Sequence, residues 1–250
     1  MSLLLLLALA ATPHPWESLS AAERRAKLEK LSHEELETML RETPPAALLR
    51  LSEKTIAALG PYEYLMVKQE RVRGTLLPEQ TIRTTIRESP SAIRLDFLKG
   101  PGAGRRVIYN ASVKTAEFKV REAGFLAFLP VWLPLDSPMA KSDSNRTVVE
   151  AGLGTLVRRL AREQGRAEGS VTITHEGWRG KDEFCSVYAL PDGGRGFDHA
   201  RTRVCVNPRA GVPTLVEGFD DRGTMLERYA FSGVKAVTPG PATFDPEKGL

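Results

Sequence analysis

Residues 62–73 read Tyr-Glu-Tyr-Leu-Met-Val-Lys-Gln-Glu-Arg-Val-Arg, a strand-like run that begins an unbroken series of such runs. Turn signals separate this run from the next ones, among them Gly74, Ser89-Pro90 and the glycine-rich residues 100–104. The further runs of this series cover residues 79–88, 92–98, 106–109 and 114–122. Short strands joined by tight turns predict an antiparallel sheet that curls around an apolar interior.

A second series of strand-like runs follows after Gly169, with alternating apolar and polar residues and tight turns. Its members are residues 170–175, 182–190, 201–207, 213–220 and 224–231. Helical patterns lie outside the two series, at residues 16–59 and 146–164. This order of elements predicts an α+β fold, in which one large curved antiparallel sheet carries its helices on a single face.

The helical segments carry start and stop signals. A serine or threonine followed three residues later by glutamate is typical of a capping box, and this pattern occurs at Ser20/Glu23, Ser32/Glu35 and Thr147/Glu150. Pro44-Pro45 breaks the first segment, and Gly165 ends the long helix predicted over residues 146–164. The arginines near its end suit the negative pole of the helix, with a lipid headgroup or a protein contact as the alternative: Arg158, Arg159 and Arg162.

Composition limits the class of protein. The chain of 250 residues is 42% hydrophobic and 26% charged, which is enough to bury a full core. Its formal charge of +4 arises from 35 basic and 31 acidic residues that are interspersed along the chain. This spread argues against a nucleic-acid partner, since such proteins concentrate basic residues in a patch.

The first eleven residues have the character of an export signal. Residues 3–9 are rich in leucine and Ala10-Ala11 supply small residues for cleavage, although no basic residue precedes the leucines. A cytoplasmic amphipathic start is the alternative. We predict a signal peptide at residues 1–11, a helical segment at 12–59 and the main domain at 60–250. No later apolar stretch has the length of a membrane helix, so we expect a mature chain that is soluble and periplasmic or otherwise exported.

The two cysteines, Cys185 and Cys205, each lie inside a strand-like run of the second series. The loop around residues 191–194 would bring these strands together as an antiparallel pair, and an exported location permits oxidation. We therefore predict a disulfide between them. The alternatives are a pair of reduced core thiols or a metal site, and the spacing of cysteines and histidines does not favour a metal.

Residues 124–134 are almost wholly apolar yet contain Pro130 and Pro134, which argues against an ordinary strand or a long helix. We expect a connection buried over the sheet edge or, alternatively, a lid or rim for a hydrophobic ligand. The side chains favoured for ligand contact are apolar or aromatic, and each has plain core packing as its alternative: Tyr64, Met66, Ile93, Leu95, Phe97, Phe118, Phe125, Phe128 and Trp132.

No arrangement of catalytic or metal-ligating residues stands out. The four histidines are scattered, and none has a metal-ligand spacing. His175-Glu176 and Asp198-His199 could each form a proton-transfer pair, but neighbours on a strand point to opposite faces, so we expect surface or turn residues. The glycines at 100–104 lack the lysine and helix of a phosphate loop. The sequence thus predicts no enzyme, no cofactor and no metal site.

Several short motifs, in order along the chain, resemble the bacterial DUF1571 family, a domain of unknown function. They are Tyr64 with residues 68–74, residues 87–90, 104–109, 135–138 and 147–153, and Phe244-Asp245-Pro246. The resemblance covers residues 60–250, and none of its motifs is catalytic. That family is similar to the periplasmic lipoprotein carriers LolA and LolB. This implies an open antiparallel half-barrel, covered by helices, with an apolar cavity for acyl chains.

These observations lead to one main hypothesis of function. We expect an exported envelope protein that binds or carries a hydrophobic ligand, such as an acyl chain or a lipidated protein, without catalysis. The alternative is a structural or protein-interaction module of the cell envelope that has the same fold and no ligand. A hydrolase that uses His175 or His199 is the least favoured hypothesis.

Overall fold

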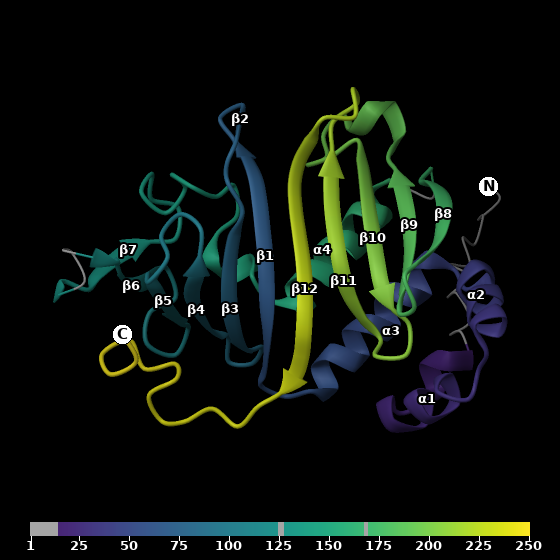
Figure 1. Cartoon of the computed structure of the whole chain (residues 1–250), viewed down its shortest axis with the longest axis horizontal. Helices are drawn as coiled ribbons and strands as arrows, with labels where there is room; N and C mark the ends of the chain where they lie inside the picture. Colours follow the sequence, from purple (N-terminus) through teal and green to yellow (C-terminus); the bar gives the residue numbers. More distant parts are fainter. Residues whose placement is uncertain (1–14, 125–127, 168–169) are drawn as a thin grey trace, which may run out of the picture.

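The computed structural model of the chain describes residues 15–124, 128–167 and 170–250. Its strands form one antiparallel sheet in the order β7-β6-β5-β4-β3-β1-β12-β11-β10-β9-β8, with β2 attached to β1 (Figure 1). The end strands β7 and β8 are far apart in this order, so the sheet is open. The strands are β1 Tyr62–Val72, β2 Thr75–Leu76, β3 Gln80–Arg87, β4 Ala92–Lys99, β5 Arg106–Asn110, β6 Glu117–Arg121, β7 Val131–Pro134, β8 Thr172–Arg179, β9 Glu183–Ala189, β10 Arg201–Asn207, β11 Val212–Phe219 and β12 Met225–Ala236.

Strands β1 and β12 lie side by side in the middle of the sheet and join the two series of strands (Figure 1). Met66 on β1 pairs with Phe231 on β12 and with Ile82 on β3. Because directly paired residues of neighbouring strands point the same way, these three side chains share one face, and all three are buried. This inner face forms the main hydrophobic core, which also contains Tyr62 and Tyr64.

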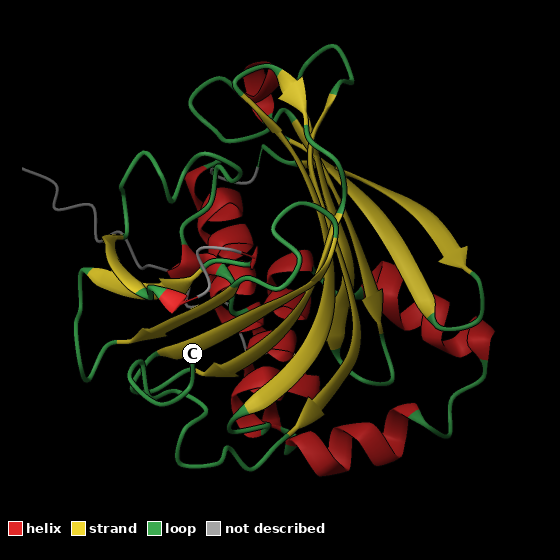
Figure 2. Cartoon of the chain, turned by 60° about the vertical axis from the view of Figure 1, so that its left-hand side comes forward, coloured by secondary structure: helices red, strands yellow, loops and turns green. Residues whose placement is uncertain are grey.

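The sheet is curved, and the helices lie on its inner face (Figure 2). Ile56 of α3 and Leu156 of α4 belong to the same core as the strands. The predicted capping boxes of Ser20 and Ser32 are both present. An α+β fold with helices on one face of a curved antiparallel sheet is therefore confirmed. The helices are α1 Ala21–Leu28, α2 His33–Glu42, α3 Pro45–Ala58 and α4 Leu153–Arg166, with 3-10 turns at Pro15–Ser18, Val148–Glu150 and Pro191–Gly194.

Helix α4 begins later than the sequence predicted. The capping box at residues 147–150 forms, but it closes a 3-10 turn, and α4 starts at Leu153. There, two residues from the sheet side satisfy the first amide groups of the helix. Leu153 N donates to Tyr62 Oη at 2.9 Å, and Gly154 N donates to Glu88 Oε1 at 3.2 Å. Long-range partners therefore replace the local cap and set the start of the helix.

The last residues of the chain, 237–250, leave the end of β12 and run back past the ends of the strands toward β4 and β5 instead of extending the sheet (Figure 1). Asn110 Nδ2 on β5 donates to Phe244 O at 3.0 Å, and Arg94 Nη1 on β4 donates to Gly249 O at 2.9 Å. The Phe244 side chain is buried. The motif around Phe244 therefore has a structural role, because it covers apolar surface on the outer side of β4 and β5.

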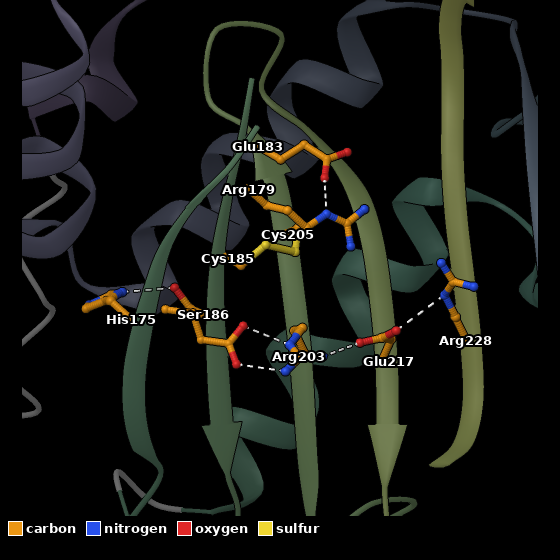
Figure 3. Close-up of a disulfide and its surroundings, with 10 residues drawn as sticks. His175, Arg179, Glu183, Cys185, Ser186, Arg203, Cys205, Glu217 and Arg228 are labelled. Carbon is orange, nitrogen blue, oxygen red and sulfur yellow. Dashed lines mark hydrogen bonds and ion pairs between the residues drawn. A yellow bond between two sulfur atoms is a disulfide. The ribbon is translucent and has the colours of Figure 1, made fainter. Parts of the chain in front are cut away.

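Cys185 on β9 and Cys205 on β10 face each other across the antiparallel pair and form the predicted disulfide (Figure 3). Leu215 and Ala230 pack beside it on the outer face. The alternatives of reduced thiols and of a metal site are therefore wrong. A row of ion pairs crosses the same face, from Glu176 through Arg203 and Glu217 to Arg228.

The apolar segment of residues 124–134 differs from its prediction. Its last four residues form the short edge strand β7, which pairs with β6. An edge strand tolerates proline because its outer backbone groups need no partner, and Pro134 is the last residue of β7. Phe128 and Leu129 are 65% and 57% exposed, so these two residues are not buried over the sheet edge. Residues 125–127 lie outside the described residues.

Candidate binding cavity

A cavity of about 170 Å³ lies between the inner face of the sheet, helix α4 as far as Arg162, and the loop of residues 135–147, which we call the cover loop. One wall of this cavity is apolar, and most of its side chains also belong to the main hydrophobic core. This wall can accept hydrocarbon but offers it no hydrogen bond. Its members from the strands are Met66, Ile82, Leu95, Phe97, Val107, Phe118, Val120, Leu133 and Phe231.

Charged side chains line the other part of the cavity. On β1, Lys68 and Glu70 continue the inward-facing series that begins with Tyr62, Tyr64 and Met66, since every second residue of a strand points to the same face. The cavity therefore changes from apolar to charged along β1. The remaining charged residues of this wall come from the ends of β5 and β6, the cover loop, the 3-10 turn that follows it, and α4: Arg105, Glu122, Asp143, Arg146, Glu150, Arg159 and Arg162.

Glu70 ties the cover loop to the sheet. Its side chain is almost fully buried and accepts hydrogen bonds from Ser144 Oγ at 3.1 Å and from Asn145 N at 2.5 Å. Tyr229 Oη on β12 donates to the same carboxylate at 2.5 Å. Lys68 Nζ donates to a carbonyl oxygen of the cover loop at 3.2 Å. These polar contacts with inward-facing strand residues hold the loop over the cavity, together with Leu135 and Ala140, which pack against the core.

Glu227 on β12 is the centre of a buried ionic cluster beside the cavity. Arg146 of the cover loop donates to both of its carboxylate oxygens, and Arg159 Nη2 of α4 donates to Oε1 at 3.2 Å. His199 Nε2 lies 3.2 Å from the same oxygen. Burial alone would raise the pKa of Glu227, but hydrogen bonds from His199 and Arg146, together with the charge of Arg159, hold it well below its usual value.

The structure corrects the expectation for one histidine pair. His199 is only 4% exposed, because its ring packs against Gly218 and reaches Glu227, so it is not a surface residue. Its neighbour Asp198 has a half-exposed side chain, which pairs with Arg146 at 2.7 Å. His175 lies on β8, is partly buried and contacts a serine hydroxyl of β9.

The nine residues predicted to contact a ligand are placed in different environments. Four of them line the cavity: Met66, Leu95, Phe97 and Phe118. Tyr64 and Ile93 are buried in the adjoining core, where Tyr64 Oη donates to Ala151 O. Trp132 on β7 lies beneath the lysine side chains of Lys114 and Lys119, and Phe128 is exposed. Phe125 lies outside the described residues. Ligand contact by these residues stays a prediction.

Sequence reasoning missed the charged wall, although a signal was present. In β1 the charged residues Lys68 and Glu70 occur in phase with the apolar residues that face the core. A charge at such a position is costly unless it is paired, so it indicates either a buried network or a site. No local pattern connects these strand residues to their partners in the cover loop, which lie more than 70 positions away.

The part of the chain that forms the cavity and the sheet matches a known protein family. The DUF1571 family, described as a protein of unknown function, matches residues 60–249. The chain belongs to this family. The match confirms the resemblance seen in the sequence and includes the sheet, the cover loop and α4, whereas α1 to α3 precede it. No curated protein matches the chain.

Several solved structures are similar to this DUF1571 protein. A putative outer membrane lipoprotein-sorting protein domain from Vibrio parahaemolyticus is 12% identical, with a TM-score of 0.41 over 80% of this chain and 96% of that one. The Mycobacterium tuberculosis lipoprotein LppX is 12% identical, with a TM-score of 0.46 over 78% and 99% of the two chains. The LolA superfamily protein NE2245 from Nitrosomonas europaea is 10% identical, with a TM-score of 0.34 over 81% and 97%.

Two further findings concern the described part of this DUF1571 protein. None of its helices there combines the length and the apolar character needed to cross a membrane. The same residues contain no group of three or more histidine, cysteine, aspartate or glutamate side chains suited to hold a metal ion.

Proposed function

We propose that this DUF1571 protein is an exported carrier that binds a hydrophobic ligand, an acyl chain or a lipidated peptide, in the cavity without catalysing a reaction. The apolar wall beneath the cover loop carries this proposal. Met66, Leu95 and Phe118 present hydrocarbon to a space that is not filled by other side chains. An unfilled cavity on an otherwise packed inner face lowers the stability of a fold. Its presence therefore favours a role in binding a ligand.

The size of the cavity limits how much ligand it holds in this conformation. An engineered cavity of about 150 Å³ accommodates benzene, so the 170 Å³ here suits about six carbon atoms. Burial of six methylene groups would contribute about 5 kcal/mol before the costs of association. A longer chain would need the cover loop to move. That movement would have to break or carry along the polar contacts of the loop with Lys68, Glu70 and Glu227.

Export is the second part of the proposal. It is supported by the leucine-rich residues 1–11, which have the pattern of a signal peptide. The disulfide between Cys185 and Cys205 also supports export, because disulfides persist in oxidising environments such as the periplasm.

Two neighbouring residues of β1 allow a matched test of the ligand site. Met66 lines the cavity, whereas Leu65 points to the outer face and is 38% exposed. Native mass spectrometry of protein purified from a bacterial envelope should detect bound lipid in the wild type and in Leu65→Trp. Met66→Trp fills the cavity and should lose the lipid. Leu95→Phe, a smaller change in the same wall, should reduce the bound fraction if Met66→Trp does not fold.

The proposal fails if the wild-type protein carries no lipid and binds no dodecyl amphiphile in solution. It also fails if both cavity variants, shown by circular dichroism to be folded, bind such ligands as the wild type does.

A further inference from the structure

We propose that the cavity selects amphiphiles with one apolar chain and an anionic head group, and that Arg162 on α4 binds this head group. The inference rests on the proposed function and adds the class of ligand. It comes from the charged wall of the cavity, where cations and carboxylates are present together. The wall's selectivity depends on which of these charges are already engaged by other side chains.

The carboxylates of the charged wall are all engaged within the protein. Glu122 and Asp143 accept hydrogen bonds from Arg105, at 2.9 and 2.7 Å. Glu150 accepts from Thr147 N at 2.8 Å and from the hydroxyl of the same residue at 2.9 Å. Glu70 is occupied by the cover loop and by a tyrosine hydroxyl. A cationic head group would therefore have to displace existing partners in order to bind here.

The cations of the wall are engaged as well, with one exception. Lys68 lies 3.4 Å from Glu70, and Arg105 holds two carboxylates. Arg146 and Arg159 both bind Glu227. Arg162 lines the cavity and is exposed, and within the described part of the chain it has neither an ion pair nor a hydrogen bond.

An unpaired guanidinium at the opening has a direct consequence for ligand choice. Arginine presents several N–H donors in a plane and binds carboxylates and phosphates in a bidentate manner. A chain whose apolar end contacts Leu95 and Phe118 would place its polar end in the charged part of the same cavity. An anionic head group there gains an ion pair without breaking an existing one. A cationic head group finds no free carboxylate among the described residues of the wall, and a neutral head group can accept hydrogen bonds from the guanidinium but forms no ion pair.

The inference can be tested with three amphiphiles that share a dodecyl chain: dodecanoate, dodecyltrimethylammonium and dodecyl maltoside. Their affinities for the full chain are measured below their micelle concentrations, by displacement of the neutral fluorophore N-phenyl-1-naphthylamine at low salt. Dodecanoate should bind about three- to tenfold more tightly than the other two, the range expected for one partly exposed charge contact. This preference should decrease when salt is added.

Arg83 provides the matched control for Arg162. It is an exposed arginine on the outer face of β3, and within the described residues it too has no ion pair or hydrogen bond. Arg162→Gln should remove the preference for dodecanoate and leave the affinity for dodecyl maltoside unchanged. Arg83→Gln should alter neither.

Each outcome decides between the proposals. If all three amphiphiles bind but dodecyltrimethylammonium binds as well as dodecanoate, or if Arg162→Gln acts no differently from Arg83→Gln, the head-group inference is overturned and the carrier proposal stands. If none of the amphiphiles displaces the fluorophore, both proposals are overturned.

Discussion

Arg146 and Glu227 are 81 positions apart in the sequence, yet they form a two-pronged ion pair. Nε and Nη2 of the arginine donate to the two carboxylate oxygens, each at 2.9 Å. The arginine lies in the cover loop and the glutamate on the inner face of β12, so the pair fastens the loop to the centre of the sheet. The Glu227 side chain is only 3% exposed, and such a carboxylate depends on its partners.

Arg146→Leu should therefore destabilise the protein strongly. Removing one partner of a buried pair leaves an incompletely compensated charge, which costs about 3 kcal/mol. Urea unfolding followed by circular dichroism measures this loss. Arg25→Leu is the control. Arg25 on α1 pairs with Glu29 just after the helix, both side chains are exposed, and the substitution should change stability little. Equal effects of the two substitutions would contradict the role assigned to Arg146.

The stability of the protein should fall in acid because of Glu227. Its pKa in the folded state is lower than its ordinary value near 4.5. The stabilisation from ionised Glu227 is therefore fully present above about pH 4.5, and it is lost as the pH falls toward the folded-state pKa. Urea unfolding between pH 3 and 7 should show this decline in the wild type. Glu227→Gln should be less stable at pH 7 and should show a smaller decline.

Glu163 on α4 should show the opposite dependence of stability on pH and serves as a control. Burial raises the pKa of this carboxyl, although Arg159 and His199 act against the shift. A raised pKa means that ionisation costs stability, so the protein loses part of its stability as the pH rises from about 4.5 through the folded-state pKa. Glu163→Gln should remove that loss and be at least as stable as the wild type at pH 7. A Glu163→Gln protein that is less stable than the wild type at neutral pH, and that still loses stability as the pH rises, would contradict this assignment.

The sheet could be predicted from the sequence because its evidence is local. Alternation of apolar and polar residues marked both strand series, and the two cysteines lay in consecutive strands of the second series. The start of α4 could not be predicted in this way. It depends on Tyr62 and Glu88, which bind the first amides of the helix from far away in the sequence.

The site was predicted only on its apolar side. Met66 and Phe118 were found because inward-facing apolar residues follow the strand period. The charged side depends on ion pairs such as Arg146 with Glu227. No pattern in the sequence shows which arginine pairs with which distant glutamate. The burial of His199 was missed for the same reason, since the space for its ring is created by Gly218 on β11.

Loss of the disulfide should lower stability without affecting the cavity. Cys185 and Cys205 are 20 positions apart, and the chain-entropy account gives about 3 kcal/mol for a loop of this length. The double variant Cys185→Ala, Cys205→Ala should unfold at lower urea concentration than the oxidised wild type. Its affinity for an amphiphile should be unchanged, because neither cysteine lines the cavity. An unchanged unfolding midpoint would show that the bond adds no stability.

Gly218→Ala should disrupt the buried cluster without altering any charge. A methyl group at Gly218 would lie 2.2 Å from Cδ2 and 2.3 Å from Nε2 of His199, closer than atoms can approach. The ring must therefore move and give up its 3.2 Å contact with Glu227. Overpacking of this kind costs about 1–3 kcal/mol, and loss of a hydrogen bond to a charged group adds to that cost.

A glycine-to-alanine substitution in α4, Gly165→Ala, should not destabilise the protein. Gly165 was predicted to end the helix but lies inside it, and no neighbouring atom is within 4 Å of the place that a methyl group would take, so Gly165→Ala meets no obstacle. Alanine favours a helix over glycine by about 1 kcal/mol in the interior and by less near the end. Urea unfolding should thus place Gly165→Ala at or above the wild type and Gly218→Ala below it. If Gly218→Ala were as stable as Gly165→Ala, His199 would not occupy the position against β11 that its contact with Glu227 requires.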